Sequence, residues 1–103
     1  MSITLNSYPV PNSKVVGRIV DNEAVLVLPE QGQVKVLNEV GARVWKLTDG
    51  SITAREIAGK ISAEYQVEQT TAEEDVVDFI ELMVKHRVIK LSDRPIMIES
   101  VKS

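Results

Sequence analysis

The first third of the chain alternates short apolar runs with turn residues. Residues 15–20 are rich in β-branched side chains, residues 24–28 are continuously apolar, and residues 33–37 begin by alternating polar and apolar side chains. Residues 29–32 have the composition of a tight turn. Because a run that is apolar on both faces suits the centre of a sheet, the pattern predicts a three-stranded antiparallel meander with residues 24–28 in the middle.

After this region the apolar spacing changes to that of helices. Asn38 is a favourable N-cap residue, and the apolar residues that follow it recur at helical spacing until an Asp-Gly pair ends the pattern. Capping-box sequences beginning at Thr53 and Thr71 predict a second and a third helix, the latter running to about His86. A short strand is predicted at residues 88–91.

This order of elements predicts one α+β domain, with three helices packed against one face of a three-stranded antiparallel sheet. A winged helix-turn-helix shares this arrangement. The length of 103 residues suits a single domain. We expect residues 1–14 to form a flexible lead-in, residues 15–91 the domain and residues 92–103 a C-terminal tail.

The composition excludes several kinds of chemistry. The chain has no cysteine, which removes disulfides, thiolate metal sites and cysteine nucleophiles. His86 is the only histidine, and it falls at a predicted helix end, where a cation favours the helix dipole. The glycines are scattered and form no phosphate-binding loop. We therefore expect no catalytic site, no metal and no cofactor.

No apolar run is long enough to span a membrane, and the first residues do not resemble a secretory signal. A cytoplasmic location is therefore expected. The net charge is −3, from 15 acidic and 12 basic residues, and residues 68–81 contain six acids and no base. Because these acids fall on the helix that would enter a DNA groove, a winged-helix DNA-binding regulator is the less favoured alternative function.

Two features favour peptide binding. The predicted strand at residues 33–37 lies at a sheet edge, where unpaired N–H and C=O groups are open to another extended chain. The apolar arc of the third helix spans roughly 220°, well beyond the 100° or somewhat more that a surface helix normally buries. Val77 and Val84, flanked by Ile80, either line a groove beside this strand or are covered by the sheet, and the periodicity leaves both open. A dimer that pairs the strand edge with itself is a third possibility, so we expect a monomer or a weak dimer.

A set of short segments then carries a family resemblance. They are Leu28-Pro29-Glu30, Leu37-Asn38-Glu39-Val40-Gly41, Leu47-Thr48-Asp49-Gly50, Thr53 with Glu56-Ile57, Tyr65 with Val67, and Asp75-Val76 with Phe79-Ile80. In this order and spacing, residues 18–89 resemble the PqqD-like family. These domains are known as recognition elements for ribosomally synthesised and post-translationally modified peptides (RiPPs), and they have a winged-helix fold.

The resemblance implies a non-catalytic adaptor that binds the leader segment of a precursor peptide and presents it to an enzyme. That partner would be a radical S-adenosylmethionine (SAM) enzyme or, as in lasso-peptide pathways, a leader peptidase. The leader would form an antiparallel strand against the third strand, in a groove walled by the third helix. Carried onto this sequence, the strand positions are Val34, Lys35, Val36 and Leu37, and the helix positions are Val77, Ile80, Glu81 and Val84.

The same comparison implies that Lys35 and either Asp78 or Glu81 select charges on the leader. Two positions depart from the family pattern. Relatives often have a glycine near Arg87, where the third helix turns into the last strand, and Leu82 and Val84 are more apolar than is usual. These departures leave the rim of the expected groove undetermined.

Overall fold

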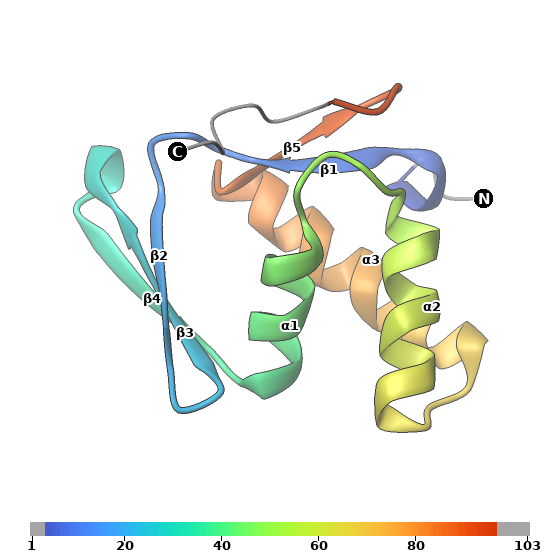
Figure 1. The fold of residues 1–103 in the computed structure, drawn as a ribbon. Coiled ribbons are helices and arrows are strands. Elements are labelled where there is room, and N and C mark those ends of the chain that lie inside the picture. The colour runs from blue at the N-terminus through green and yellow to red at the C-terminus, as the bar shows by residue number, and fades with distance from the viewer. Residues whose placement is uncertain (1–3, 97–103) are drawn as a thin grey trace.

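The computed structural model describes residues 4–96 and contains the predicted three-stranded meander. Strands β2 (Val16–Val20), β3 (Glu23–Leu28) and β4 (Gln33–Leu37) form an antiparallel sheet in the order β2-β3-β4 (Figure 1). The side chains of Ala24, Leu26 and Leu28 alternate toward the helices and are buried. The continuous apolar run therefore marks the central strand, as predicted.

Three helices follow on one side of this sheet, which confirms the predicted α+β fold. They are α1 (Glu39–Leu47), α2 (Ala54–Tyr65) and α3 (Gln69–Lys85). The Asn38 side chain accepts a hydrogen bond from the Gly41 N–H at 2.9 Å, and Thr53 and Glu56 form the predicted capping box of α2. The predicted start of α3 at Thr71 is wrong. The helix begins three residues earlier, because Glu68 and not Thr71 is its N-cap, and the Glu68 side chain makes no capping hydrogen bond.

The N-terminal segment differs from the expected flexible lead-in. A 3-10 turn, η1 (Thr4–Asn6), lies against α2 and α3, and β1 (Tyr8–Pro11) pairs with β5 (Ile89–Ser92) in a second, two-stranded sheet (Figure 1). The physical reason is long-range pairing, because the residues that hold this segment lie more than 40 positions away in the chain. The Ala54 N–H, for example, donates to the Ser7 carbonyl at 3.0 Å.

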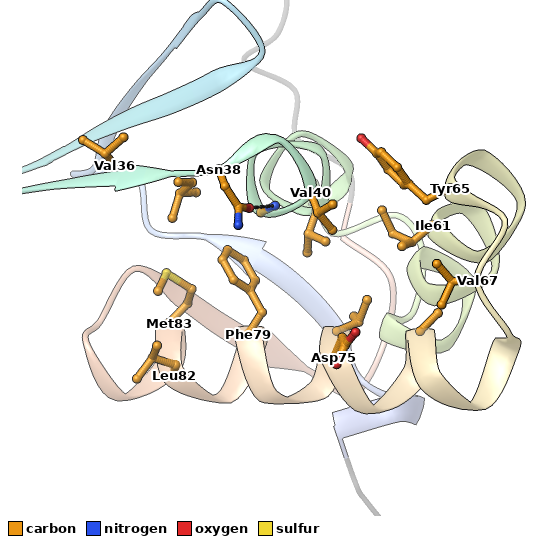
Figure 2. Close-up of a pocket in the computed structure, with 15 residues that line it drawn as sticks. Val36, Asn38, Val40, Ile61, Tyr65, Val67, Asp75, Phe79, Leu82 and Met83 are labelled. Atoms are coloured by element: carbon orange, nitrogen blue, oxygen red, sulfur yellow. Dashed lines mark hydrogen bonds between the residues drawn. The ribbon is translucent and has the colours of Figure 1, made fainter.

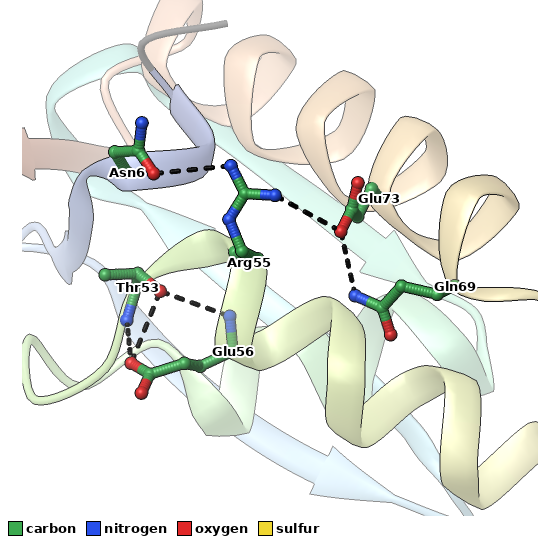
Figure 3. Close-up of polar contacts among 6 residues, drawn as sticks. All are labelled: Asn6, Thr53, Arg55, Glu56, Gln69 and Glu73. Atoms are coloured by element: carbon green, nitrogen blue, oxygen red, sulfur yellow. Dashed lines mark hydrogen bonds and ion pairs between the residues drawn. The ribbon is translucent and has the colours of Figure 1, made fainter.

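Polar side chains reinforce this attachment between η1 and the two helices. Arg55 Nη2 donates to Asn6 Oδ1 at 3.4 Å, and Arg55 Nη1 lies 3.5 Å from Glu73 Oε2 (Figure 3). Thr4 Oγ1 donates to Glu81 Oε2 at 2.8 Å. At the other end, the Ile96 N–H donates to the Gly50 carbonyl at 2.8 Å, and the remainder of the expected tail lies outside the described residues.

The hydrophobic core lies where the sheet, the helices and β5 meet. Its largest fully buried side chains come from all of these elements and include Leu26, Val44, Ile57, Ile80 and Ile89. Burial of each such aliphatic side chain contributes about 1.5–3 kcal/mol to folding. Among the residues that the structure describes, no helix has the length and hydrophobicity needed to cross a membrane.

The C-terminal end of α3 is held by side chains from two connecting segments. Gln31, in the β3–β4 turn, donates from Nε2 to the His86 carbonyl at 2.7 Å, and Asn12, between β1 and β2, donates from Nδ2 to the Arg87 carbonyl at 2.6 Å. We call the hydrogen bond from Gln31 the clasp. Arg87 has φ of 65°, a left-handed conformation that glycine adopts most easily. The turn that lacks the family's glycine is thus made by an arginine.

A single tryptophan lies between α1 and β2. Trp45 is half-buried, and Gly17 on β2 faces its indole. A Cβ atom at Gly17 would lie 2.7 Å from Trp45 Nε1 and 3.1 Å from Leu26 Cδ2, so only glycine leaves room for this contact. The glycine that interrupts the first β-branched run therefore has a packing role.

Candidate functional site: a groove beside an edge strand

An apolar groove runs between β4 and α3. Its volume is about 500 Å³, and its floor continues past the start of α1 to the end of α2 (Figure 2). The lining residues are Val36, Leu37, Asn38, Val40, Gly41, Val44, Ile61, Tyr65, Val67, Ala72, Asp75, Val76, Phe79, Leu82 and Met83. A groove of this volume and composition suits an extended peptide with apolar side chains.

On the β4 side, the groove is bordered by an open edge of the sheet. β4 pairs with β3 only, so its other edge has no strand beside it in the described part of the chain. Of the predicted strand residues, Val36 and Leu37 line the groove, whereas Val34 and Lys35 lie further along the strand, toward the β3–β4 turn. Val34 and Val36 expose 62% and 63% of their surface, on the sheet face opposite to Leu37.

The structure does not place the predicted helix residues in the groove. Ile80 is fully buried in the core, and Val84 is half-buried against it. Asp78 is exposed but is not among the lining residues. None of these three side chains is among the residues that line this groove, and their part in leader binding stays a prediction.

Val77 and Glu81 also point away from the groove, since they lie one helical turn apart on the face of α3 that meets η1. Glu81 accepts the hydrogen bond from Thr4 there. The wall is instead formed by Phe79, Leu82 and Met83. The segment η1 covers the face of α3 that carries Glu81, so a different face of the helix borders the groove.

One sequence signal pointed to the observed wall. Leu82 is an apolar residue at a position of the third helix that the predicted core does not use. It lies on the opposite side of this helix from Val77. In the structure 48% of Leu82 is exposed, at the rim of the groove. An apolar residue left outside the predicted core was thus the better marker.

Gly41 allows a close contact in the groove. A Cβ atom at this position would lie 3.3 Å from Phe79 Cε1 and 3.4 Å from Leu37 Cβ. The glycine in the first turn of α1 therefore lets the Phe79 ring approach β4 and α1. Asn38, which also lines the groove, already uses its side-chain oxygen to cap α1.

The polar groups of the groove lie toward the end of α2. Tyr65 Oη donates to Glu39 Oε2 at 3.4 Å. Partial burial, followed by the nearby Glu39 carboxylate, raises the pKa of Tyr65, so its phenol stays neutral and keeps its proton. Asp75 is the only residue with a formal charge among those that line the groove. Within residues 4–96 no cluster of three or more histidine, aspartate or glutamate side chains could hold a metal ion.

Comparison with solved structures identifies proteins of the same fold. The chain is 31% identical to TbiB1, solved in complex with the TbiA(beta) leader peptide, with a TM-score of 0.73 over 79% of this chain and 94% of that one. It is 19% identical to lasso peptide synthetase B1 complexed with its leader peptide, with a TM-score of 0.72 over 81% and 98% of the two chains.

A third similar structure is the PqqD truncation of Methylobacterium extorquens PqqCD, described as a functional, stand-alone RiPP recognition element. The identity is 26% and the TM-score 0.67, over 80% of this chain and 87% of that chain. Comparison with curated proteins gave no match. The family model for coenzyme PQQ synthesis protein D (PqqD) matches residues 23–89, which is more than half of the chain. The chain therefore belongs to the PqqD family.

Proposed function

We propose that this protein binds the leader segment of a ribosomally synthesised precursor peptide and delivers it to a modifying enzyme in the cytoplasm, without catalysing a reaction itself. The observation that carries this proposal is the meeting of an edge strand, β4, with an apolar groove of about 500 Å³. Two of the similar solved structures are complexes with leader peptides. The groove needs no cofactor to do this work.

The leader would add an antiparallel strand to β4. Main-chain hydrogen bonds to the Val34–Leu37 edge would give affinity, and the groove would accept alternate leader side chains. The apolar contacts would come from Phe79, Leu82 and Met83 in place of the helix residues expected from the sequence.

Delivery requires a surface that stays accessible when the groove is filled. The outer face of the sheet fits this need, because the residues Val16, Val27 and Val34 stand opposite one another across its three strands and are 40–62% exposed. This face supports contact with an enzyme partner. A radical SAM enzyme and a leader peptidase are the two candidates.

The direct test is a titration with a fluorescently labelled leader peptide, synthesised from a precursor gene adjacent to the gene for this protein. We expect micromolar or tighter binding, measured by fluorescence anisotropy. Binding no better than millimolar would contradict the proposal. Tight, salt-sensitive binding to duplex DNA in the same assay would instead favour the regulator, against which the acidic side chains of α3 argue.

A further inference from the structure

We infer that the leader carries a lysine or arginine on the amino-terminal side of the segment that pairs with β4, and that Asp75 binds this cation. The inference rests on the proposed leader-binding function and adds to it the charge that the leader must carry. It starts from the one charged side chain in an otherwise apolar groove.

The Asp75 carboxylate has no partner in the described part of the chain. Two other acids of α3 are occupied, since Glu73 contacts Arg55 and accepts from Gln69 Nε2 at 2.9 Å (Figure 3), and Glu81 accepts from Thr4. Glu74 and Asp78 are also without a partner in this part of the chain, but neither lines the groove. No hydrogen bond or ion pair within residues 4–96 engages Asp75, although it borders the groove. An acid left free beside a binding groove is available to a ligand.

The surroundings of Asp75 favour a cation. Tyr65 lies across the groove (Figure 2), and its hydroxyl donates to the Glu39 carboxylate at 3.4 Å. Arg43, the base beside them, is neutralised by Glu64 through contacts of 2.7 and 2.8 Å. This end of the groove therefore attracts positive charge.

The direction of β4 decides which part of the leader reaches Asp75. The strand runs from Gln33 to Leu37, and the groove continues beyond Leu37 toward the end of α2. An antiparallel leader runs the opposite way, so its earlier residues lie at the Asp75 end. Asp75 and Phe79 are one helical turn apart, about 6 Å along the axis. This separation matches about two residues of an extended peptide.

The cation is therefore expected about two residues before the leader side chain that packs on Phe79. An α-amino group at the start of the leader has the same charge, so the test peptide must exclude it. The probe is the leader from the neighbouring precursor gene, acetylated at its N-terminus and labelled at its C-terminus. Each lysine or arginine preceding the pairing segment is changed to glutamine or to glutamate.

The protein variants are Asp75→Asn and Asp75→Lys, with Glu74→Gln as the matched control. Glu74 is an exposed acid on the same helix that does not line the groove. We expect Asp75→Asn to weaken binding about fivefold, as for a partly exposed ion pair of about 1 kcal/mol. Glutamine at the responsible leader position should cause the same loss, and the two losses should not add. Asp75→Lys should recover affinity for the leader with glutamate at that position.

The outcomes separate this inference from the function on which it rests. A wild-type protein that does not bind the leader overturns both. If the wild-type protein binds the leader tightly, three results overturn the inference alone. They are unchanged binding in Asp75→Asn, an equal loss of affinity in Glu74→Gln, and a leader that has no base before its pairing segment. A loss that disappears at high salt, together with the charge-exchange rescue, supports the ion pair.

Discussion

The sheet has two outer strands that differ in what lies beside them. β2 exposes all five of its residues, and the hollow near its end, lined by Ile19 and α1, has a volume of about 120 Å³. Three charged residues, Glu39, Arg43 and Lys46, border that hollow. β4 lies beside an apolar groove about four times as large, in which Asp75 is the only formally charged residue.

The comparison teaches that an open strand edge is not sufficient for selective peptide binding. Both edges can offer main-chain hydrogen bonds, which any extended chain can form. Only β4 has a neighbouring helix that leaves space for side chains of the added strand. We therefore expect β4 to bind the leader and β2 to contribute little, and the following experiments test that contrast.

The largest effect is expected from proline in the strand edge. Val36→Pro should abolish detectable leader binding if it removes an outward N–H donor, whereas Ile19→Pro on β2 should leave the affinity unchanged. Successive N–H groups of a strand point to opposite sides, so of residues 35 and 36 one donates outward and the other toward β3. Lys35→Pro is therefore made as well, and at least one of the two variants retains the pairing to β3. Circular dichroism and thermal melting identify that variant, and its normal binding would contradict the β4 site.

A smaller loss is expected from trimming the groove wall. Leu82 on α3 borders the groove and Val20 lies on β2, and both residues are 48% exposed. Leu82→Ala should weaken leader binding about tenfold because it removes apolar surface that the leader would bury, and Val20→Ala should have no effect. Isothermal titration calorimetry measures both. Equal losses in the two variants would place the leader elsewhere.

The clasp offers a more indirect test of the same contrast. It joins the turn that precedes β4 to the end of α3, and β4 and α3 are the two elements that border the groove. The β2–β3 turn has no such connection among the described hydrogen bonds. Gln31→Glu removes the donor to the His86 carbonyl and should weaken leader binding a few-fold, about 1 kcal/mol at most. Gln31→Lys keeps a donor and should restore much of the affinity. Unchanged leader binding in Gln31→Glu would show that the clasp does not control the distance between β4 and α3.

The smallest effect is on stability alone. Arg87 occupies a left-handed position at the end of α3, so Arg87→Gly should raise the free energy of unfolding by up to about 1 kcal/mol. Leader binding should not change, because the Arg87 carbonyl that accepts from Asn12 is retained. Urea denaturation measures the shift, and a destabilised glycine variant would mean that the arginine side chain has an unseen role.

The elements whose signals are local were predicted well from the sequence. The apolar run of β3, the Asn38 cap and the Thr53 capping box are each recognised from a few residues that are adjacent in the sequence. The start of α3 was missed because Glu68 provides no side-chain cap, while Thr71 and Glu74 imitate one inside the helix.

The difference between the predicted helix residues and those that line the groove has a different origin. Residues 8–11 read Tyr-Pro-Val-Pro, a sequence with no strand periodicity, and their pairing with β5 spans about 80 residues. Without that pairing, nothing in the sequence indicates that η1 covers the Val77 and Glu81 face of α3. The edge strand was therefore predicted, whereas the face of α3 that borders the groove depends on a long-range contact.

The packing of Trp45 against Gly17 has an optical consequence. The only tryptophan of the chain is fixed on the β2 side of the sheet, away from the groove residues of α3. Its fluorescence therefore reports unfolding of the β2–α1 contact without any label. A leader that binds at β4 should leave the emission maximum in place, and a peptide that displaces β2 should shift it to longer wavelength. The protein thus carries an intrinsic probe that distinguishes its two edges.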